Sequence, residues 1–345
     1  MSPAELARTV YAPPAASTSW RLADLYAPAR LRCYRFGRHA LADAFRAAGG
    51  GPVLIPGFFC REVLSAVPAA GGRCLFYSVG PDLQPDQDSS RWPEAKSVLA
   101  VDFFGFPAGL EPFRAYARRT GAAIVEDACH ALFSRDPEGR LLGTRADFGA
   151  LSPRKTLPLS DGGVLLETGA ASGKTLPPAA EAVGEPTLRS KLKAAARPLL
   201  AAAGARTART LLETLRGARG FDWHDRIGRE GSEDEPLGDS APSAALSAPI
   251  GCGDEAGERT RRRGLYELCA ETARGLGLTP VFPRLTDGVV PYAFPFRAKP
   301  DEAEDAYAAY RRLGLSVLPW PDLPEGIRDG APAHYRDVYL AHFLW

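Results

Sequence analysis

Between about residues 36 and 167, short runs of apolar residues alternate with longer amphipathic stretches. The apolar runs are nearly continuous, which is typical of parallel strands that are buried on both faces. The amphipathic stretches have the length of surface helices and end on glycines. We therefore predict an α/β fold, in which helices cover both faces of a mainly parallel sheet. The predicted strands are 52–58, 73–79, 97–105, 122–128, 147–152 and 162–167, and the predicted helices are 37–50, 61–72 and 110–121.

The pattern changes after about residue 168. A basic stretch rich in Ala, Leu and Arg predicts a helical insert at about 185–222 in the large domain. We expect a solvated helical hairpin there, with contact to a membrane surface or to nucleotide phosphates as the alternative. The large α/β domain is predicted to cover 1–250, and a small C-terminal α+β domain 251–345. The remaining predicted elements are a loop at 229–244, helices at 254–277 and 300–314, and a strand at 289–298.

Composition and charge narrow the function classes. The 345 residues carry 42 basic and 41 acidic side chains, a balance that argues against a nucleic-acid partner held by a broad basic face. The six cysteines form no CxxC pair, so we expect neither a zinc site nor a disulfide framework. The first 20 residues lack a basic start followed by an apolar run, and no stretch of about 20 apolar residues occurs. We therefore expect a cytoplasmic protein without a membrane span.

Lys155 is the most conspicuous of the six lysines. It alone follows the C-terminal end of a predicted strand and precedes a Gly-Gly turn. Ligands of open α/β sheets collect at that edge. A lysine removed from water there, next to the cation Arg154, would lose its proton readily and become competent for Schiff-base chemistry. The alternative is an ordinary loop lysine.

Asp127 favours the first of these two interpretations of Lys155. Successive strand residues point to opposite faces, so Glu126 and Asp127 cannot both serve one site. An acid at a strand end can hold a metal, accept a proton or pair with a buried cation. Pyridoxal phosphate needs a lysine for its aldehyde and an acid for its pyridinium nitrogen. Asp127 and Lys155, on neighbouring strand ends, supply that pair.

The stretch from about 37 to 167 resembles the DegT/DnrJ/StrS family of fold-type-I pyridoxal-phosphate enzymes, which are mostly sugar aminotransferases. The segments that carry the resemblance are "VLIPGFFCREVLSAVPAAGG", "DFFGFPAGLEPFRAYARRTGAAIVEDACHAL" and "SPRKTLPLSDGGVLL". The small domain continues it less specifically, through "VPYAFPFRA" and "GLSVLPWPDLP". The resemblance implies a large domain with a seven-stranded type of sheet sandwiched by helices, and a homodimer.

The resemblance also implies roles for single residues. Lys155 matches the lysine that carries the cofactor, and Asp127 matches the partner of the pyridinium nitrogen. His130 matches a position that contacts the hydroxyl side of the cofactor, and Ser152 matches a serine that binds the phosphate. Two alternatives stay open: His130 satisfies only a backbone carbonyl, or Ser152 only caps the turn.

The residues "GRHAL" at 37–41 match the phosphate-binding turn at a helix N-terminus, where unpaired N–H groups favour an anion. This assigns Gly37, Arg38 and His39 to cofactor binding. The family pattern there is Ser-Gly-Thr, so a guanidinium replaces a hydroxyl at residue 38, and Arg38 can bind a phosphate through two parallel donors.

Three other features depart from the family. Cys60 aligns with the aromatic residue that stacks on the cofactor ring, and Phe59 or Phe58 is the expected substitute. The loop between Ser152 and Lys155 is shortened, and the loop by which a partner subunit completes the phosphate site is not recognisable. These departures indicate a divergent member of the family.

The sequence thus predicts a pyridoxal-phosphate-dependent aminotransferase, with Lys155 as the general base and acid. Glutamate or another amino acid would donate the amine, and a keto sugar nucleotide would accept it. The alternatives are another pyridoxal phosphate reaction, such as elimination or condensation, and a cofactor-binding protein that has lost transamination.

Overall fold

The computed structural model describes residues 15–85, 88–157, 159, 161–168 and 248–343, together with scattered positions between 192 and 246. The predicted helical insert and most of the predicted loop at 229–244 lie outside the described residues. Within the described part of the chain, no helix is long and apolar enough to cross a membrane.

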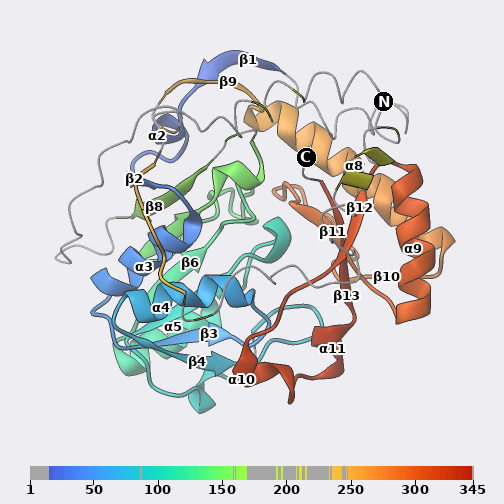
Figure 1. The fold of residues 1–345 in the computed structure, drawn as a ribbon. Helices are drawn as coiled ribbons and strands as arrows, with labels where there is room; N and C mark the ends of the chain where they lie inside the picture. The colour runs from blue at the N-terminus through green and yellow to red at the C-terminus, as the bar shows by residue number, and fades with distance from the viewer. Residues whose placement is uncertain are drawn as a thin grey trace.

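A seven-stranded sheet forms the centre of the large part of the molecule (Figure 1). Its order is β2-β8-β7-β6-β5-β3-β4, and the five strands β3 to β7 run parallel to one another. β8 is antiparallel to β7 and to the edge strand β2. Every residue of the inner strands β5, β6 and β7 is buried, which explains their continuous apolar sequence. The strands are β2 (Arg30–Tyr34), β3 (Pro52–Pro56), β4 (Arg73–Tyr77), β5 (Ser97–Val101), β6 (Ala123–Asp127), β7 (Phe148–Leu151) and β8 (Gly163–Glu167).

Helices pack against this sheet along their buried faces. α3 (Gly37–Ala47) contacts β7 and β8, and α5 (Glu111–Thr120) contacts β6. The predicted helix at 61–72 is instead a 3₁₀ turn, η1 (Arg61–Ser65), followed by the short α4 (Ala66–Ala69). Pro68 has no N–H to donate four residues back, and its ring disfavours a continuous helix there. The shorter elements are α2 (Leu22–Leu25), η2 (Ser89–Arg91), η3 (Phe103–Gly105) and η4 (Pro153–Lys155).

The C-terminal part contains a separate antiparallel sheet of order β10-β11-β13-β12, orange to red in Figure 1. The long helix α8 (Glu255–Gly275) leads into it, and α9 (Pro300–Arg312) packs on β12. The other elements are β10 (Thr279–Pro280), β11 (Ala293–Arg297), β12 (Ser316–Pro319), α10 (Glu325–Arg328), α11 (Ala333–Arg336) and β13 (Val338–His342).

The prediction of an α/β fold with a mainly parallel sheet and a small C-terminal α+β part is confirmed. Several elements were not predicted, above all the edge strand β2 and the small-sheet strands β12 and β13. A further unpredicted strand, β1 (Ala15–Trp20), pairs with β9 (Ile250–Cys252). The domain division at 250/251 stays a prediction, because β9 crosses it.

Candidate active site

The site lies where β6 and β7 end. These strands are parallel neighbours, and Asp127, the last residue of β6, stands opposite Ala150 of β7. Ser152 follows β7 directly and leads into η4, whose last residue is Lys155. Parallel strands bring their carboxyl ends to one edge, so residues 25 or more apart in sequence meet there.

Lys155 contacts His130 directly. The distance from Nζ of Lys155 to Nε2 of His130 is 3.0 Å. Burial lowers the pKa of His130 well below its usual value, and the nearby Lys155 lowers it further. A neutral imidazole accepts a hydrogen bond at its bare nitrogen, so Nε2 of His130 accepts a hydrogen bond from the lysine amine.

Two aromatic rings stack on the His130 ring. Tyr292 stacks on it at 4.2 Å between centroids with 6° between planes, and Phe104 stacks at 5.7 Å and 8°. Trp320 approaches edge-on at 6.0 Å. The backbone N–H of Tyr292 donates to the carbonyl of Phe104 at 2.8 Å, which ties the two flanking residues together. The C-terminal part of the chain therefore contributes a wall of the site.

Asp127 is buried, with 6% of its surface exposed. Its Oδ1 accepts a hydrogen bond from the N–H of Cys129 at 3.0 Å. Burial raises the pKa of Asp127, and the positive charge of Lys155 opposes that rise. No ion pair of the described residues involves Asp127. A buried carboxylate of this kind is suited to receive a cation.

Glu126 points away from this site, as strand alternation predicts. Its carboxylate accepts from Nε of Arg145 at 2.6 Å and from the N–H of that residue at 2.8 Å. Arg145 also bonds Asp102 at 2.6 Å. Burial raises the pKa of Asp102 well above its ordinary range. Glu126 is thus engaged with Arg145, and of the two adjacent acids only Asp127 lies at the candidate site.

The N-terminus of α3 packs tightly against the same edge. A Cβ added to Gly37 would come within 2.7 Å of Sγ of Cys129 and 3.6 Å of Cβ of Ser152. The first turn of the helix can approach the strand ends this closely because residue 37 has no side chain. Gly37, Cys129 and Ser152 are thus brought together, as a phosphate cradle beside Lys155 requires.

Three arginines surround the ring of Phe36 just before that helix. The guanidinium carbons of Arg38, Arg154 and Arg35 lie 4.7, 4.9 and 5.7 Å from its centroid. Arg38 pairs with Glu62 at 2.5 Å, and Arg35 with Asp239 at 3.8 Å. Arg154 forms no ion pair with any described residue, and its buried Nε has no hydrogen-bond partner among them. The described part of the chain therefore leaves one cation at this turn without an anion.

Two predicted ligands are engaged elsewhere. His39 caps its own helix: Nδ1 accepts from the N–H of Phe36 at 3.2 Å, and Nε2 donates to the carbonyl of Leu237 at 2.9 Å. Both ring nitrogens of His39 are thus used, which does not support a cofactor contact. The hydroxyl of Ser152 donates to the carbonyl of Gly162 at 3.2 Å, so its proton serves the turn, the alternative left open above.

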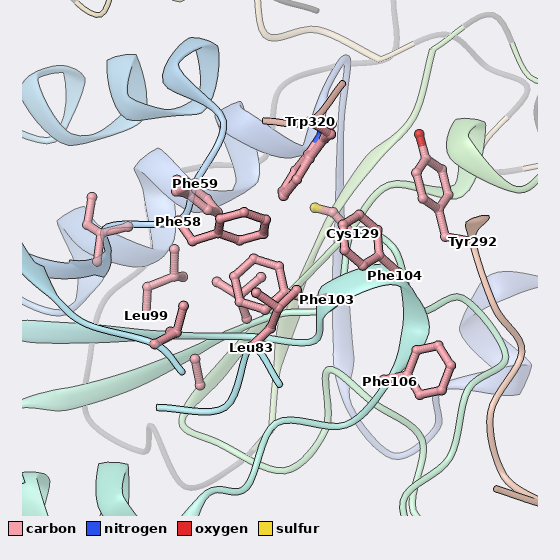
Figure 2. Packing of buried hydrophobic residues seen from close by; sticks show 14 of the residues in the cluster. Phe58, Phe59, Leu83, Leu99, Phe103, Phe104, Phe106, Cys129, Tyr292 and Trp320 are labelled. Atoms are coloured by element: carbon pink, nitrogen blue, oxygen red, sulfur yellow. The ribbon is translucent and has the colours of Figure 1, made fainter. Parts of the chain in front are cut away.

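The predicted aromatic substitutes are in the core. Phe58 packs against Phe103 and Trp320, at 5.5 and 5.2 Å between ring centroids (Figure 2). It also packs against Tyr335, at 5.3 Å. Phe59 is likewise buried, with 4% of its surface exposed. Burial raises the pKa of the Cys60 thiol to about 11, and the positive charge of Lys155 opposes that rise.

The sequence missed Tyr292, Phe104 and Trp320, which shape the wall around His130. One signal was available for Phe104, because η3 directly follows β5 at the carboxyl edge of the sheet. The other two come from the C-terminal part, and their sequence context gives no sign of their place.

Comparisons with known proteins match this description. Residues 89–174, which include Asp127, His130, Ser152 and Lys155, match the model of the DegT/DnrJ/EryC1/StrS aminotransferase family. A pleiotropic regulatory protein of Geobacillus stearothermophilus is 26% identical over 140 residues, which are 38% of this chain and 37% of the relative. The match thus spans little more than a third of that relative's length.

The fold agrees with solved aminotransferases. A DegT/DnrJ/EryC1/StrS aminotransferase from Brucella abortus superimposes with a TM-score of 0.60 at 17% identity, over 93% of this chain and 83% of its own. The enzyme DesI, solved with its TDP-sugar product, gives 0.59 at 16% identity, over 98% and 79%. The predicted resemblance and the predicted fold are confirmed.

Proposed function

We propose that this chain, as a relative of the DegT/DnrJ/EryC1/StrS aminotransferases, is an aminotransferase that depends on pyridoxal phosphate. The observation that carries the proposal is the contact of Lys155 with His130 at 3.0 Å, beside a buried Asp127 that has no ion pair among the described residues. The family model covers all three residues.

The residues present fit the cofactor. Lys155 would hold its aldehyde, and Asp127 would accept the hydrogen bond of its protonated ring nitrogen. Its phosphate would lie at the N-terminus of α3, where the absence of a side chain on Gly37 lets the helix pack closely against Cys129. Positive charge there would come from Arg38 and from Arg154, which has no ion pair among the described residues.

Bound pyridoxal phosphate supplies an electron-withdrawing ring that stabilises negative charge on the substrate carbon. The protein's own part is to move a proton. Nζ of Lys155 would take the proton from the substrate carbon as general base and would then deliver it to the cofactor as general acid. His130, kept neutral by its surroundings, would accept a hydrogen bond from that amine without competing as a cation.

The proposed substrates are small molecules. An amino acid, with glutamate first, would donate the amine, and a keto sugar nucleotide would accept it. The solved relative with a TDP-sugar product supports the acceptor class. A homodimer and a cytoplasmic location belong to the same proposal.

A second function is a cofactor-binding protein that no longer transaminates and serves regulation. The observation in its favour is the similarity to a protein named pleiotropic regulatory protein, together with the arginine in the phosphate turn. Another pyridoxal phosphate reaction, elimination or condensation, is the alternative within enzymes.

The test is to reduce the protein with borohydride in the presence of pyridoxal phosphate and to locate the label by peptide mass spectrometry. We expect the label on Lys155. Lys155→Ala should abolish it, and Lys299→Ala, an exposed control, should leave it unchanged. A label on Lys174 or Lys299 in the wild-type protein would overturn the assignment.

Glutamate separates the three functions. A transaminating protein should release about one equivalent of 2-oxoglutarate per bound cofactor, with a change in the visible spectrum. Cofactor uptake without any release of oxo acid, from glutamate or from other amino acids, would favour the regulatory protein. Release of ammonia instead would favour elimination.

A further inference from the structure

Arg262 is a buried cation of α8. Its side chain is about 1% exposed, and it forms an ion pair with Glu258, which is fully buried one turn earlier, at 2.7 Å. Arg261 bonds the same carboxylate at 2.7 Å. Burying charges costs free energy unless they are paired and hydrogen-bonded, so the remaining donors of Arg262 need partners.

Those partners are three backbone carbonyls from distant segments. Nη2 of Arg262 donates to the carbonyl of Thr156, and Nη1 donates to the carbonyls of Pro291 and Tyr292, each at 3.2 Å. None of the three residues lies in a helix or strand, so helix and sheet hydrogen bonding provides no backbone donor for their carbonyls. A planar guanidinium can reach several acceptors at once, which an ammonium group cannot do in this geometry.

The two segments that Arg262 joins both support the catalytic contact. Thr156 directly follows Lys155, and its carbonyl fixes the end of the lysine turn. Tyr292 stacks on His130, with 4.2 Å between the ring centroids. The contacts thus form a closed circuit: Arg262 to Thr156, Lys155 to His130, and His130 through Tyr292 back to Arg262.

We propose that Arg262 is a positioning residue, whose guanidinium holds the lysine turn and the Tyr292 ring together so that Nζ of Lys155 meets Nε2 of His130. Only the catalytic role of this arrangement rests on the proposed function. The arrangement of the side chains is a property of the protein without cofactor.

Arg262 remains charged at neutral pH, although burial lowers its pKa to about 10. Replacing it therefore removes both a charge and three hydrogen bonds to carbonyls. A residue that only stabilises the fold would lower the melting temperature and leave the His130 environment of the folded molecules unchanged. A positioning residue changes that environment as well.

The readout is the titration of His130 in the full-length protein, followed by NMR of ¹⁵N-labelled imidazoles. The chain has only five histidines, and His130→Gln identifies the signal of interest. The charged or titratable groups facing His130 are Lys155, Tyr292 and His342, which bonds the Tyr292 hydroxyl at 2.9 Å. None of these three residues is substituted in the Arg262 variants.

In the wild type, His130 should stay neutral well into the acid range. In Arg262→Gln its midpoint should rise by about one pH unit or more toward the ordinary value, because the ring loses its packed partners. Arg262→Lys should lie between the two. Arg263→Gln is the matched control, since Arg263 of the same helix bonds the carbonyls of Thr286 and Val289 and does not touch the lysine turn.

An Arg262→Gln protein that folds and keeps the wild-type titration of His130 would overturn the proposal. If that variant does not fold, hydrogen exchange of the wild type decides. The amide of Leu157, which bonds Pro153 in the lysine turn, should then open together with the amides of α8 around Arg262. Independent, much faster opening of the turn counts against the proposal. Because neither measurement uses cofactor, both are separable from the borohydride test of the proposed function.

Discussion

The arginines around Phe36 allow a prediction whose sign and size follow from the structure. Arg38 lies 4.7 Å from the ring and is held by Glu62 at 2.5 Å. Its side chain is 23% exposed and that of Glu62 is 43% exposed. Glu62 therefore competes with the cofactor phosphate for the same guanidinium, and the two substitutions Arg38→Ala and Glu62→Gln should have opposite effects.

For Arg38→Ala we expect a loss of about 1.5–3 kcal/mol, the range for a hydrogen bond to a charged group. This corresponds to a roughly 10- to 150-fold increase in the Kd for pyridoxal phosphate. For Glu62→Gln we expect a gain of about 0.5–1 kcal/mol, because the acid is partly exposed and its pairing is screened by water. Binding should then be about two- to fivefold tighter.

Arg154 should matter at least as much as Arg38. No described acid pairs with it, and its buried Nε has no hydrogen-bond partner among the described residues, so nothing there competes with a phosphate. Arg154→Ala should therefore weaken binding by about the same 1.5–3 kcal/mol or slightly more. Arg35→Ala is the control, since Arg35 touches the same ring at 5.7 Å but is 41% exposed and pairs with Asp239. Its effect should stay within about 0.5 kcal/mol.

The assay is an equilibrium titration of each variant with pyridoxal phosphate, repeated with pyridoxal, which lacks the phosphate. The changes should appear with the phosphorylated ligand and vanish with pyridoxal. In the Arg38→Ala background, Glu62→Gln should lose most of its effect, because the two residues act as a pair. The reasoning is refuted by an unchanged Kd in Arg38→Ala, by an equal loss with pyridoxal, or by weaker binding in Glu62→Gln.

Three more predictions concern the sheet edge and the assembly. Asp127→Asn should lower turnover about 100-fold or more with the fold retained, and near-normal turnover would contradict the role of Asp127. Glu126→Gln should instead lower the melting temperature, because it breaks the buried contact with Arg145. Gly37→Ala should cost about 1–3 kcal/mol of stability, because its Cβ would meet Sγ of Cys129 at 2.7 Å; the added substitution Cys129→Ala should restore most of it, and thermal melting of both variants checks the pair. Light scattering should show a homodimer, and a monomer with full activity would refute that expectation.

Much of the large domain was predictable from the sequence because its signals are local. Strands buried on both faces are continuous apolar runs, and β3, β5, β6 and β7 appear where those runs occur. The edge strand β2 was missed because Arg30 and Arg32 interrupt its pattern, as an edge permits. Lys155 and Asp127 could be recognised because each directly follows or ends a strand, and parallel strands bring such positions to one edge. The different fates of Glu126 and Asp127 likewise follow from the two-residue period of a strand.

Only the tertiary structure decided what surrounds these residues. His39 looked like a phosphate ligand because it stands in the first turn of α3, but both its nitrogens bond backbone groups, one of them 198 residues away in sequence. Phe58 and Phe59 were expected to face a cofactor, but both are buried in the hydrophobic core. Tyr292 and Arg262 were not recognised at all, because their partners are far away in sequence. Tyr292 lies 162 residues after His130, and Arg262 lies 106 residues after Thr156. Periodicity reports which face of an element is buried, whereas the partner of a buried polar group depends on which segments the fold brings together.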